Sequence, residues 1–399
     1  MGHIFGQHDE QTLIQLEHVS RGALKTSLMA DGHVGYFMPI GGVAAYDNTL
    51  SPVGVGFDIA CGNCAILTDA SLDDVRKDTD RLADEIQSTI SFGLGRTNKA
   101  DDAPLDHELF DSDAWELVPK NRVSLKQKAR NQLGTVGSGN HYVDVFHDEQ
   151  NRIWVGVHFG SRGFGHAIAS GFLNISQNRA WDGRNPPEIE TLLDINGSIG
   201  SAYWELMTLA GAYAYAGREW VARKVVGILG AHEKDMIHNH HNFAWRERHE
   251  IAGQMRDVIV VRKGATPAFP GQRGFVGGSM ADGSVIIKGA GDSALQADAL
   301  YSTVHGAGRI MSRTKARGKI NRKTGKVIKA GAISPEMMSQ RIKRAGVTLR
   351  GGGLDESPHV YRNLRDVLAA QGDTIKILHR LTPLIVVMAG ADVFDQYRD

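Results

Sequence analysis

The sequence contains little cysteine, carries no net charge and has no long apolar run, and each of these absences excludes a class of protein. Two cysteines, Cys61 and Cys64, among 399 residues are too few for a disulfide framework, so we expect reduced thiols. No stretch approaches the roughly 18 apolar residues that a membrane-spanning helix needs. The polar first residues lack the layout of a secretion signal, and we therefore expect a cytoplasmic protein.

The charge balance and the glycine content indicate where a ligand would bind. Lysine plus arginine and aspartate plus glutamate each total 45 residues, so the formal net charge is zero. Such a chain has no overall attraction to nucleic acid, and binding would have to come from a local patch. Glycine is abundant, at 47 residues, and the glycines cluster beside polar motifs. This clustering indicates tight backbone near a ligand rather than a flexible linker.

The apolar pattern predicts a mixed α+β fold with one compact domain over residues 1–399. Helical periodicity covers 71–90 and 201–228, and the first helix would begin with a capping box formed by Ser71 and Asp74. The predicted buried face of that helix comprises Leu72, Val75, Leu82 and Ile86. Short apolar runs predict strands at 153–157, 258–261, 285–287 and 383–387. Because several runs end in Gly, Ser or His motifs, we expect an active site built from strand ends and glycine-rich loops.

The segment 54–62, Gly-Val-Gly-Phe-Asp-Ile-Ala-Cys-Gly, places a carboxylate, Asp58, three residues before a thiol, Cys61. Such a pair binds a transition metal only if other ligands arrive from elsewhere. The candidates are histidines in glycine- or asparagine-rich settings, namely His141, His158 and His241. Thiolate and imidazole suit Zn, Fe, Co or Mn, and a thiolate can bridge two ions.

Other interpretations of these residues stay open at this point. Cys61-x-x-Cys64 could be half of a structural zinc site, although the sequence lacks the second close pair of ligands, or a redox pair. A single histidine among the 17 is more often structural than a ligand. A local cluster, of which one or two members would bind metal, comprises His238, His240, His241 and His249.

A candidate nucleophile is His305, which opens His-Gly-Ala-Gly-Arg. If a helix begins here, its first amides would bind an anion, and Arg309 one turn later would clamp a phosphate. A neutral imidazole can attack phosphorus near pH 7. The alternative is a histidine that only binds metal.

Further segments offer groups that bind phosphate or a base. They are 262–267 with Arg262 and Lys263, 277–284 with Ser279 and Ser284, and 355–361 with carboxylates and Tyr361. Eight lysines and arginines between 313 and 329 predict a basic surface arm that suits RNA phosphates.

The order of these motifs resembles the RNA-splicing ligase RtcB family, from Asp31-Gly32-His33 to Pro383. The landmarks are residues 54–62, 133–141, 158–163, 240–242, 262–265, 278–280 and 305–309. The resemblance implies an RtcB-like fold and an enzyme that joins RNA 3′-phosphate or 2′,3′-cyclic phosphate ends to 5′-hydroxyl ends. It also implies GTP as co-substrate, manganese as cofactor, and a place in RNA repair or tRNA splicing.

The resemblance further implies a role for each site residue. His305 would take GMP from GTP and pass it to the RNA 3′-phosphate, from which the 5′-hydroxyl displaces it. Two Mn²⁺ ions would be held by Asp58, Cys61, His141, His158 and His241. The nucleotide would be bound by Asn140, Tyr142, Asp144, Ser279, Ser284, Arg309 and Tyr361. The RNA end would meet Asp31 and Arg162.

The chain also departs from the family pattern. Met388 stands where the family has a lysine that reaches the nucleotide, and Asp144 stands where it has a glutamate. Tyr36 occupies a position that is commonly basic, and residues 313–331 are expected to be a basic surface insertion. The alternative function is a metal-dependent RNA cyclic phosphodiesterase or nucleotidyl hydrolase without efficient ligation. A third class, a non-catalytic sensor of RNA ends, fits less well because His305 and all five candidate ligands are present.

Overall fold

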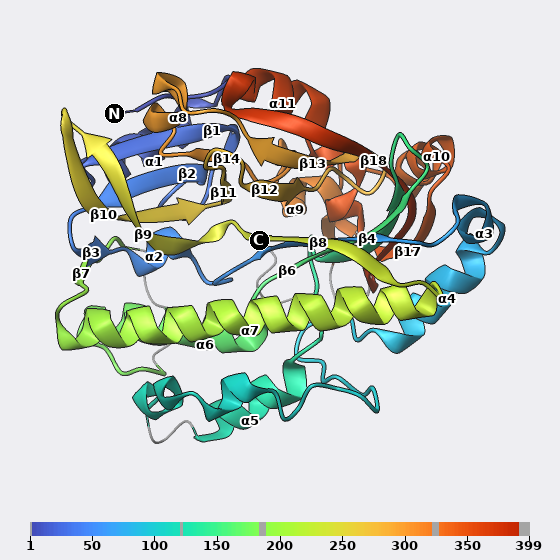
Figure 1. Ribbon diagram of the computed structural model, residues 1–399, viewed down its shortest axis with the longest axis horizontal. Coiled ribbons are helices and arrows are strands. Elements are labelled where there is room, and N and C mark those ends of the chain that lie inside the picture. The colour runs from blue at the N-terminus through green and yellow to red at the C-terminus, as the bar shows by residue number, and fades with distance from the viewer. Residues whose placement is uncertain (1, 120–122, 183–188, 321–326, 391–399) are drawn as a thin grey trace.

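Two sheets form the frame of the fold in the computed structural model, which describes residues 2–119, 123–182, 189–320 and 327–390 (Figure 1). The larger sheet contains, in spatial order, β12 (Arg273–Val276), β13 (Ser284–Gly289), β18 (Ile375–Gly390), β5 (Tyr142–His147), β6 (Ile153–Phe159), β4 (Gly62–Thr68) and β8 (Glu233–His240), with β17 (Thr348–Gly352) also paired to β18. The smaller sheet contains β1 (Lys25–His33), β2 (Ile40–Tyr46), β10 (Gln254–Lys263) and β9 (Asn242–Ile251). Two-stranded ribbons pair β3 (Thr49–Leu50) with β7 (Leu193–Asp194), β11 (Ala265–Pro267) with β14 (Ser302–Val304), and β15 (Gly318–Ile320) with β16 (Val327–Ala330). The predicted mixed α+β architecture is confirmed.

The four strands predicted from apolar runs are confirmed as parts of β6, β10, β13 and β18. All seven residues of β6 are buried, because other elements cover both faces of the sheet there. β4 lies between β6 and β8, with Gly62 opposite Phe159 on one side and opposite His240 on the other. Segments that are far apart in the sequence therefore end at the same edge of the sheet.

Helices cover these sheets, and the longest, α7 (Ser198–Ile228), runs along almost the whole molecule (Figure 1). It packs against β4 and β6 and confirms the helix predicted for 201–228. The other α-helices are α1 (Glu10–Ser20), α2 (Pro52–Val55), α3 (Leu72–Lys77), α4 (Thr79–Thr89), α5 (Val123–Gln132), α6 (Arg162–Ser176), α8 (Ala294–Asp298), α9 (Arg313–Arg317), α10 (Pro335–Ala345) and α11 (Leu364–Gln371). Short 3₁₀ turns are η1 (Glu108–Asp111), η2 (Asp113–Leu117), η4 (Leu354–Glu356), η5 (Pro358–Val360) and η6 (Gly372–Thr374).

The single helix predicted for 71–90 is two helices, α3 and α4, which meet at Asp78. The predicted start is confirmed, since the Ser71 side chain accepts a hydrogen bond from the backbone N–H of Asp74. The predicted inward residues Leu72, Val75, Leu82 and Ile86 are all buried. Asp78 has φ −125° and ψ 23°, outside the helical region. Aspartate favours such local breaks because its side chain competes with the helical backbone for hydrogen bonds.

The position of Arg262 at a strand end had suggested a cation that binds phosphate, but the structure places its guanidinium in the core. Its guanidinium is fully buried and donates to both carboxylate oxygens of Glu247, at 2.7 and 3.0 Å. It also donates to the Ser302 hydroxyl and the Leu300 carbonyl. Arg262 therefore ties β10 to β9 and β14 as a structural residue.

The predicted basic arm at 313–331 begins as an anchored segment rather than a solvated one. Ala316 in α9 is fully buried, and Arg313 forms ion pairs with the buried carboxylates Asp355 and Glu356. β15 and β16 then form a hairpin, and the part of the prediction at 321–326 lies outside the described residues. The anchoring follows because two buried carboxylates need nearby cations.

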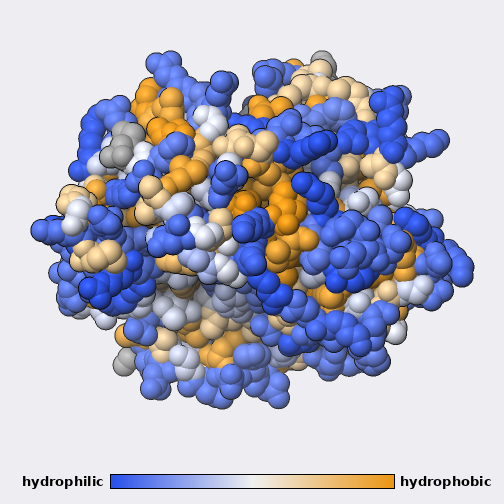
Figure 2. Space-filling model, turned by 45° about the horizontal axis from the view of Figure 1, so that its top comes forward, coloured by the Kyte–Doolittle hydropathy of each residue, from blue (hydrophilic) through white to orange (hydrophobic). Residues whose placement is uncertain are grey.

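The exposed surface is mainly polar. Hydrophilic side chains cover most of the face in Figure 2, with an apolar strip near the middle of the view. Among the described helices none combines the length and apolarity needed to cross a membrane.

We predict that Glu247→Ala destabilises the fold by about 3–5 kcal/mol, because it leaves the buried guanidinium of Arg262 without its counter-charge. Burial alone would raise the pKa of Glu247, but Arg262 and His249 lower it below the usual value. The stabilisation is therefore complete at neutral pH and is lost as the pH falls through the folded-state pKa. Urea unfolding at pH 7 and in acid measures both effects.

The matched control is Glu85→Ala, whose carboxylate is exposed and pairs with Arg81 on the surface. We expect the control to change stability by no more than about 0.5 kcal/mol. Equal effects of the two variants would contradict a structural role for the buried pair.

Candidate active site and metal centre

Three predicted ligands, Cys61, His141 and His158, converge although they are distant in the sequence. The Cys61 Sγ lies 3.8 Å from His141 Nε2 and 3.6 Å from His158 Nε2. One ligand atom from each residue lies within 4.8 Å of those of the other two, which is a spacing that one ion can bridge. Asp58 completes the group, with its Oδ2 3.1 Å from His141 Nε2.

The loop between α2 and β4 presents Asp58 and Cys61. Ala60, between them, has φ 59°, a left-handed conformation that turns the chain sharply. A Cβ at Gly160 would lie 2.3 Å from Asp58 Oδ1, so only glycine leaves room for this carboxylate. The Asp58 side chain is about one-third exposed, whereas His141 is nearly buried. The cluster therefore opens to solvent on the side of Asp58.

Hydrogen bonds fix the orientation of two of the imidazoles. His141 donates from Nδ1–H to the Val136 carbonyl at 2.9 Å, and His158 donates from Nδ1–H to Asn63 Oδ1 at 2.7 Å. In His158 this leaves the lone pair on Nε2, which faces Cys61, whereas His141 Nε2 faces both Cys61 and the Asp58 carboxylate. Partners of this kind are typical of histidines that ligate metals.

His241 lies beside this group and extends it into a row of imidazoles. Its ring stacks on His158 with centroids 5.2 Å apart, and its backbone N–H donates to the Cys61 carbonyl. The next ring in the row is His305, 4.9 Å from His241. Among the described residues, His241 Nδ1 is buried without a hydrogen-bond partner, as expected of a group that ligates an ion.

The electrostatics of the cluster suit a bound cation. Burial alone would raise the pKa of Asp58, but His141 and Arg162 lower it to about 2. Burial and the nearby Asp58 raise the pKa of the Cys61 thiol well above its usual value. Burial and neighbouring histidines lower the pKa of His158 and His241, so both rings are neutral at pH 7. Neutral imidazoles, one carboxylate and a thiol that a metal would ionise form a donor set that fits a transition metal.

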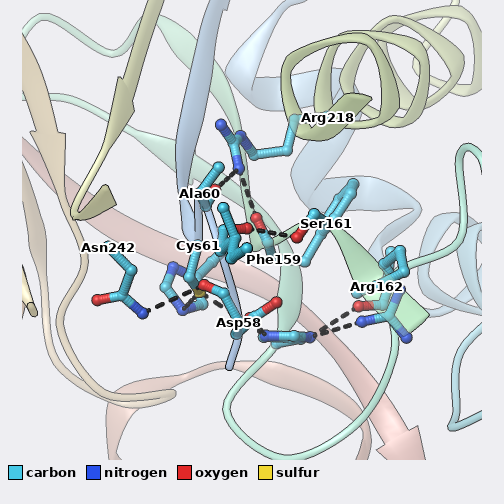
Figure 3. Close-up of polar contacts among 12 residues, drawn as sticks. Asp58, Ala60, Cys61, Phe159, Ser161, Arg162, Arg218 and Asn242 are labelled. Atoms are coloured by element: carbon cyan, nitrogen blue, oxygen red, sulfur yellow. Dashed lines mark hydrogen bonds and ion pairs between the residues drawn. The ribbon is translucent and has the colours of Figure 1, made fainter. Parts of the chain in front are cut away.

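Arg218 on α7 donates hydrogen bonds to the backbone and side chains around this site. The sequence analysis did not identify it. Figure 3 shows its guanidinium donating to the carbonyls of Ala60 and Phe159, at 2.8 and 2.6 Å. It also donates to His238 Nε2 and His240 Nδ1, at 2.7 and 2.9 Å. The side chain is fully buried. A sequence signal existed, because Arg218 continues the buried stripe of α7 at a helical spacing from Ala214.

One guanidinium thus contacts residues next to three candidate ligands. Ala60 precedes Cys61, Phe159 follows His158, and His240 precedes His241. His238 and His240 accept from Arg218 with ring nitrogens and serve as structural groups. Of the predicted histidine cluster, His241 alone joins the row with His158, and His249 instead pairs with Glu247 at 2.7 Å.

No helix begins at His305, a possibility that the sequence had left open. β14 ends at Val304, and the following residues form isolated bridges between Gly306 and Gly277 and between Arg309 and Tyr361. Gly308 has φ 73°, a left-handed conformation that interrupts a helix.

Asp31, rather than a helix, positions His305. Its Oδ2 lies 2.6 Å from His305 Nδ1 and accepts hydrogen bonds from the backbone N–H groups of His305 and Gly306. Asp31 is fully buried. Burial alone would raise its pKa, but His305 lowers it below the usual value. The ionised carboxylate therefore lies at ion-pair distance from the Nδ1 side of the His305 ring and leaves Nε2 on the far side of the ring.

Arg309 and Tyr361 lie together, and Arg309 is not on the helix that the sequence had left open as a possibility. Arg309 Nη1 donates to Tyr361 Oη at 2.8 Å and to Glu356 Oε2 at 3.1 Å. The guanidinium carbon lies 5.0 Å from the Tyr361 ring centroid. A buried carboxylate therefore fixes Arg309 in place.

Tyr142 and Asp144 occupy β5 next to the imidazole row. The Tyr142 ring stacks on His158 with centroids 5.3 Å apart, and Met388 lies opposite it in the pairing with β18. Burial raises the pKa of the Asp144 carboxyl well above its usual value. Within the described chain, Tyr142 Oη and Asp144 Oδ1 are buried without hydrogen-bond partners. Two unsatisfied polar atoms in one place are expected where a polar ligand binds.

The remaining predicted site residues border the same region. Asn140 is exposed immediately before His141, and Ser284 Oγ accepts from the N–H of Gly278 at 3.0 Å. The Ser279 hydroxyl donates to Asp282. Arg162, at the start of α6, places Nη1 3.3 Å from His141 Nδ1. Its guanidinium lies over Gly137, where a Cβ would be 2.2 Å from it.

Comparisons with known proteins show which sequences this chain is similar to. The family described as tRNA-splicing ligase RtcB matches residues 13–389. The chain is 30% identical to the tRNA-splicing ligase RtcB of Thermococcus kodakarensis, over 94% of this chain and 90% of the relative. It is 29% identical to the tRNA-splicing ligase RtcB of Archaeoglobus fulgidus, over 90% and 86% of the two chains. It is also 29% identical to the RNA-splicing ligase RtcB of Escherichia coli, over 90% and 89%.

We predict that Arg218→Met loosens the loop that carries Cys61. Each lost hydrogen bond from a charged donor is worth about 1.5–3 kcal/mol, so labelling of Cys61 by a thiol reagent should accelerate at least about tenfold. Peptide mass spectrometry measures the labelling of Cys61 separately from that of Cys64, which is fully buried in β4.

Cys64 is the internal control, and Arg223→Ala is the matched variant on the same helix, since Arg223 is half exposed. We expect neither Cys64 in Arg218→Met nor Cys61 in Arg223→Ala to react faster. Parallel acceleration of both thiols in Arg218→Met would indicate global unfolding and contradict the local role.

Proposed function

This chain belongs to the RtcB tRNA-splicing ligase family, and we propose that it joins RNA 3′-phosphate or 2′,3′-cyclic phosphate ends to 5′-hydroxyl ends, with GTP and Mn²⁺. The observation that carries the proposal is the pairing of His305 with the buried Asp31 at 2.6 Å, at the end of the row of candidate ligands. An imidazole oriented by a carboxylate is the arrangement that an activated nitrogen nucleophile needs.

In the first step, His305 Nε2 attacks the α-phosphorus of GTP. A P–N bond forms, the bond to the bridging oxygen breaks, and pyrophosphate leaves with the electron pair. Asp31, whose carboxylate lies 2.6 Å from Nδ1, would stabilise the cationic ring that forms. His305 then carries GMP.

In the second step, an oxygen of the RNA 3′-phosphate attacks the GMP phosphorus, and the P–N bond breaks to restore His305. In the third step, the 5′-hydroxyl attacks the 3′-phosphate, loses its proton and displaces GMP. A cyclic phosphate would first be opened by water to a 3′-phosphate.

In the proposed function Asp58, Cys61, His141, His158 and His241 would hold two metal ions. When bound, the ions would neutralise charge on the phosphate oxygens. Tyr142 and Asp144 would complete their unsatisfied hydrogen bonds with the base, beside Met388. Arg162, next to His141, would meet the RNA end.

The test of the nucleophile is the intact mass of the protein after incubation with Mn²⁺ and either GTP or ATP. We expect a GMP adduct on the parent protein and none on His305→Ala. Asp31→Asn should label at least about tenfold more slowly, because it removes the negative charge beside the His305 ring, and contacts of this kind with a charged group are worth about 1.5–3 kcal/mol.

Three outcomes would contradict parts of the proposal. An adduct on His305→Ala would exclude His305 as the nucleophile. An AMP adduct in place of GMP would overturn the nucleotide assignment. Opening of a cyclic phosphate without adduct or joined product would favour the phosphodiesterase function.

The metal assignment predicts proton release. The raised pKa of Cys61 keeps its thiol protonated before binding, whereas Asp58 is already ionised and His158 and His241 are already neutral. Binding at pH 7 should therefore release about one proton, and affinity should rise about tenfold per pH unit. Calorimetric titration with Mn²⁺ in two buffers of different ionisation enthalpy measures the release.

The control is Cys61→Ser, whose hydroxyl does not ionise in this range. We expect it to bind Mn²⁺ more weakly and without proton release. Full metal affinity in this variant would exclude Cys61 as a ligand.

A further inference from the structure

Three aromatic rings, Tyr36, Phe57 and His166, form a row at the solvent side of the candidate metal centre. The Phe57 and His166 rings stack with centroids 5.3 Å apart, and Tyr36 meets Phe57 edge to face at 6.3 Å. Phe57 and His166 are half-buried, and Tyr36 is 49% exposed. Phe57 immediately precedes Asp58, whose side chain is the most exposed of the cluster around Cys61. We call these three rings the aromatic row.

The loop that carries Tyr36 is held in place by α1. Gln15 is nearly buried, and its amide donates to the carbonyls of Gly35 and Tyr36, at 2.8 and 2.9 Å. Its oxygen accepts from the N–H of Gly35 at 2.9 Å. Met38, two residues later, is fully buried in the core. The exposure of the Tyr36 ring is therefore a feature of a fixed loop.

Cations flank the aromatic row. Lys263 is buried, donates to the Val53 carbonyl and has its Nζ 5.6 Å from the Tyr36 ring centroid, so it adds positive potential behind the ring rather than a direct phosphate contact. At the other end, exposed Lys128 on α5 lies beside Gly163, next to Arg162 on α6. Aromatic faces combined with cations that track a backbone are the features of surfaces that bind single-stranded nucleic acid. A nonpolar partner would not need the flanking cations.

The position of the row indicates which RNA strand it would meet. The imidazole row begins at His305 and ends at His141 beside Asp58. In the proposed reaction GMP leaves on the side of His305, and the attacking and leaving oxygens lie roughly in line. The 5′-hydroxyl strand therefore approaches from the side of Asp58, where the aromatic row lies.

We propose that the aromatic row is a stacking surface for the terminal base of the 5′-hydroxyl RNA strand, with Tyr36 as the exposed contact. This inference rests on the proposed ligase function for the identity of the strand. Stacking on an aromatic ring tolerates any base, because every base has a π-face. The row would thus hold the 5′ end near the metal centre without reading its sequence.

The test measures binding of a short single-stranded RNA with a 5′-hydroxyl end by fluorescence anisotropy, to Tyr36→Ala, Tyr36→Phe and the parent protein. Stacking is worth about 1–3 kcal/mol per base, so Tyr36→Ala should weaken binding by about 5- to 150-fold. Tyr36→Phe keeps the ring and should bind as the parent protein does. The matched control is Val34→Ala in the same loop, whose side chain is 45% exposed and not aromatic, and it should also bind normally.

A second RNA, without a base at its 5′-terminal nucleotide, makes the test specific. The missing base should weaken binding to the parent protein by about the same factor as Tyr36→Ala does. In Tyr36→Ala, the missing base should cause no further loss of affinity. Equal affinity of Tyr36→Ala and the parent protein would overturn the proposal. A third RNA lacks the 3′-terminal base instead. If it shows the same loss of binding, the assignment to the 5′ strand is overturned.

Labelling with GTP separates this inference from the ligase proposal. Tyr36→Ala should form the GMP adduct at the parental rate, because in this proposal Tyr36 acts on the RNA strand and takes no part in the attack of His305 on GTP. If the parent protein forms no adduct but its RNA binding depends on Tyr36 as described, the stacking surface stands and the ligase proposal falls. Loss of adduct formation in Tyr36→Ala would show a structural role and overturn the stacking proposal.

Discussion

The candidate active site depends on one buried interaction, the set of hydrogen bonds that Arg218 donates from α7. Within the described chain, two carbonyls and two neutral imidazoles, rather than a carboxylate, accept the hydrogen bonds of this guanidinium. Its acceptors come from the loop before β4, the end of β6 and the end of β8. Because a buried cation is costly unless its donors are satisfied, these segments are held at fixed separations. The convergence of Cys61, His158 and His241 follows from that constraint.

The same burial sets the charge of the site before any ligand arrives. Burial favours neutral forms, and it keeps the Cys61 thiol protonated and the imidazoles of His158 and His241 uncharged. Asp58 stays ionised because His141 and Arg162 outweigh burial. A cation that bound to such a group would displace the thiol proton and gain a thiolate ligand. The binding energy of the ion would therefore provide the free energy needed to ionise the buried thiol.

Much of this arrangement could be predicted from the sequence, because it depends on local pattern. Strand positions and α7 follow from apolar periodicity, and Asp58, Cys61, His141 and His158 stand out by residue type and glycine-rich surroundings. Long-range contacts could not be found in this way. Asp31 meets His305 across 274 residues, and no local feature of either motif indicates the pair.

The wrong predictions have the same origin. A helix at His305 is compatible with the sequence, but the bridge between Gly306 and Gly277 and the left-handed Gly308 impose a different path. Arg262 has the residue type of a phosphate ligand, yet Glu247 from a neighbouring strand neutralises it within the core. In each case a tertiary partner overrides what the local segment favours.

The two ends of the imidazole row are connected to different parts of the fold, and this explains how base recognition and chemistry can be linked. The Tyr142 ring stacks on His158, and its hydroxyl lies against Gly277, where a Cβ would approach it to 2.3 Å. Gly277 is bridged to Gly306, the residue after His305. In the proposed function, a base bound at Tyr142 would therefore contact packed backbone that leads to the candidate nucleophile. The Asp58 end of the row opens to solvent, because the Asp58 side chain is about one-third exposed.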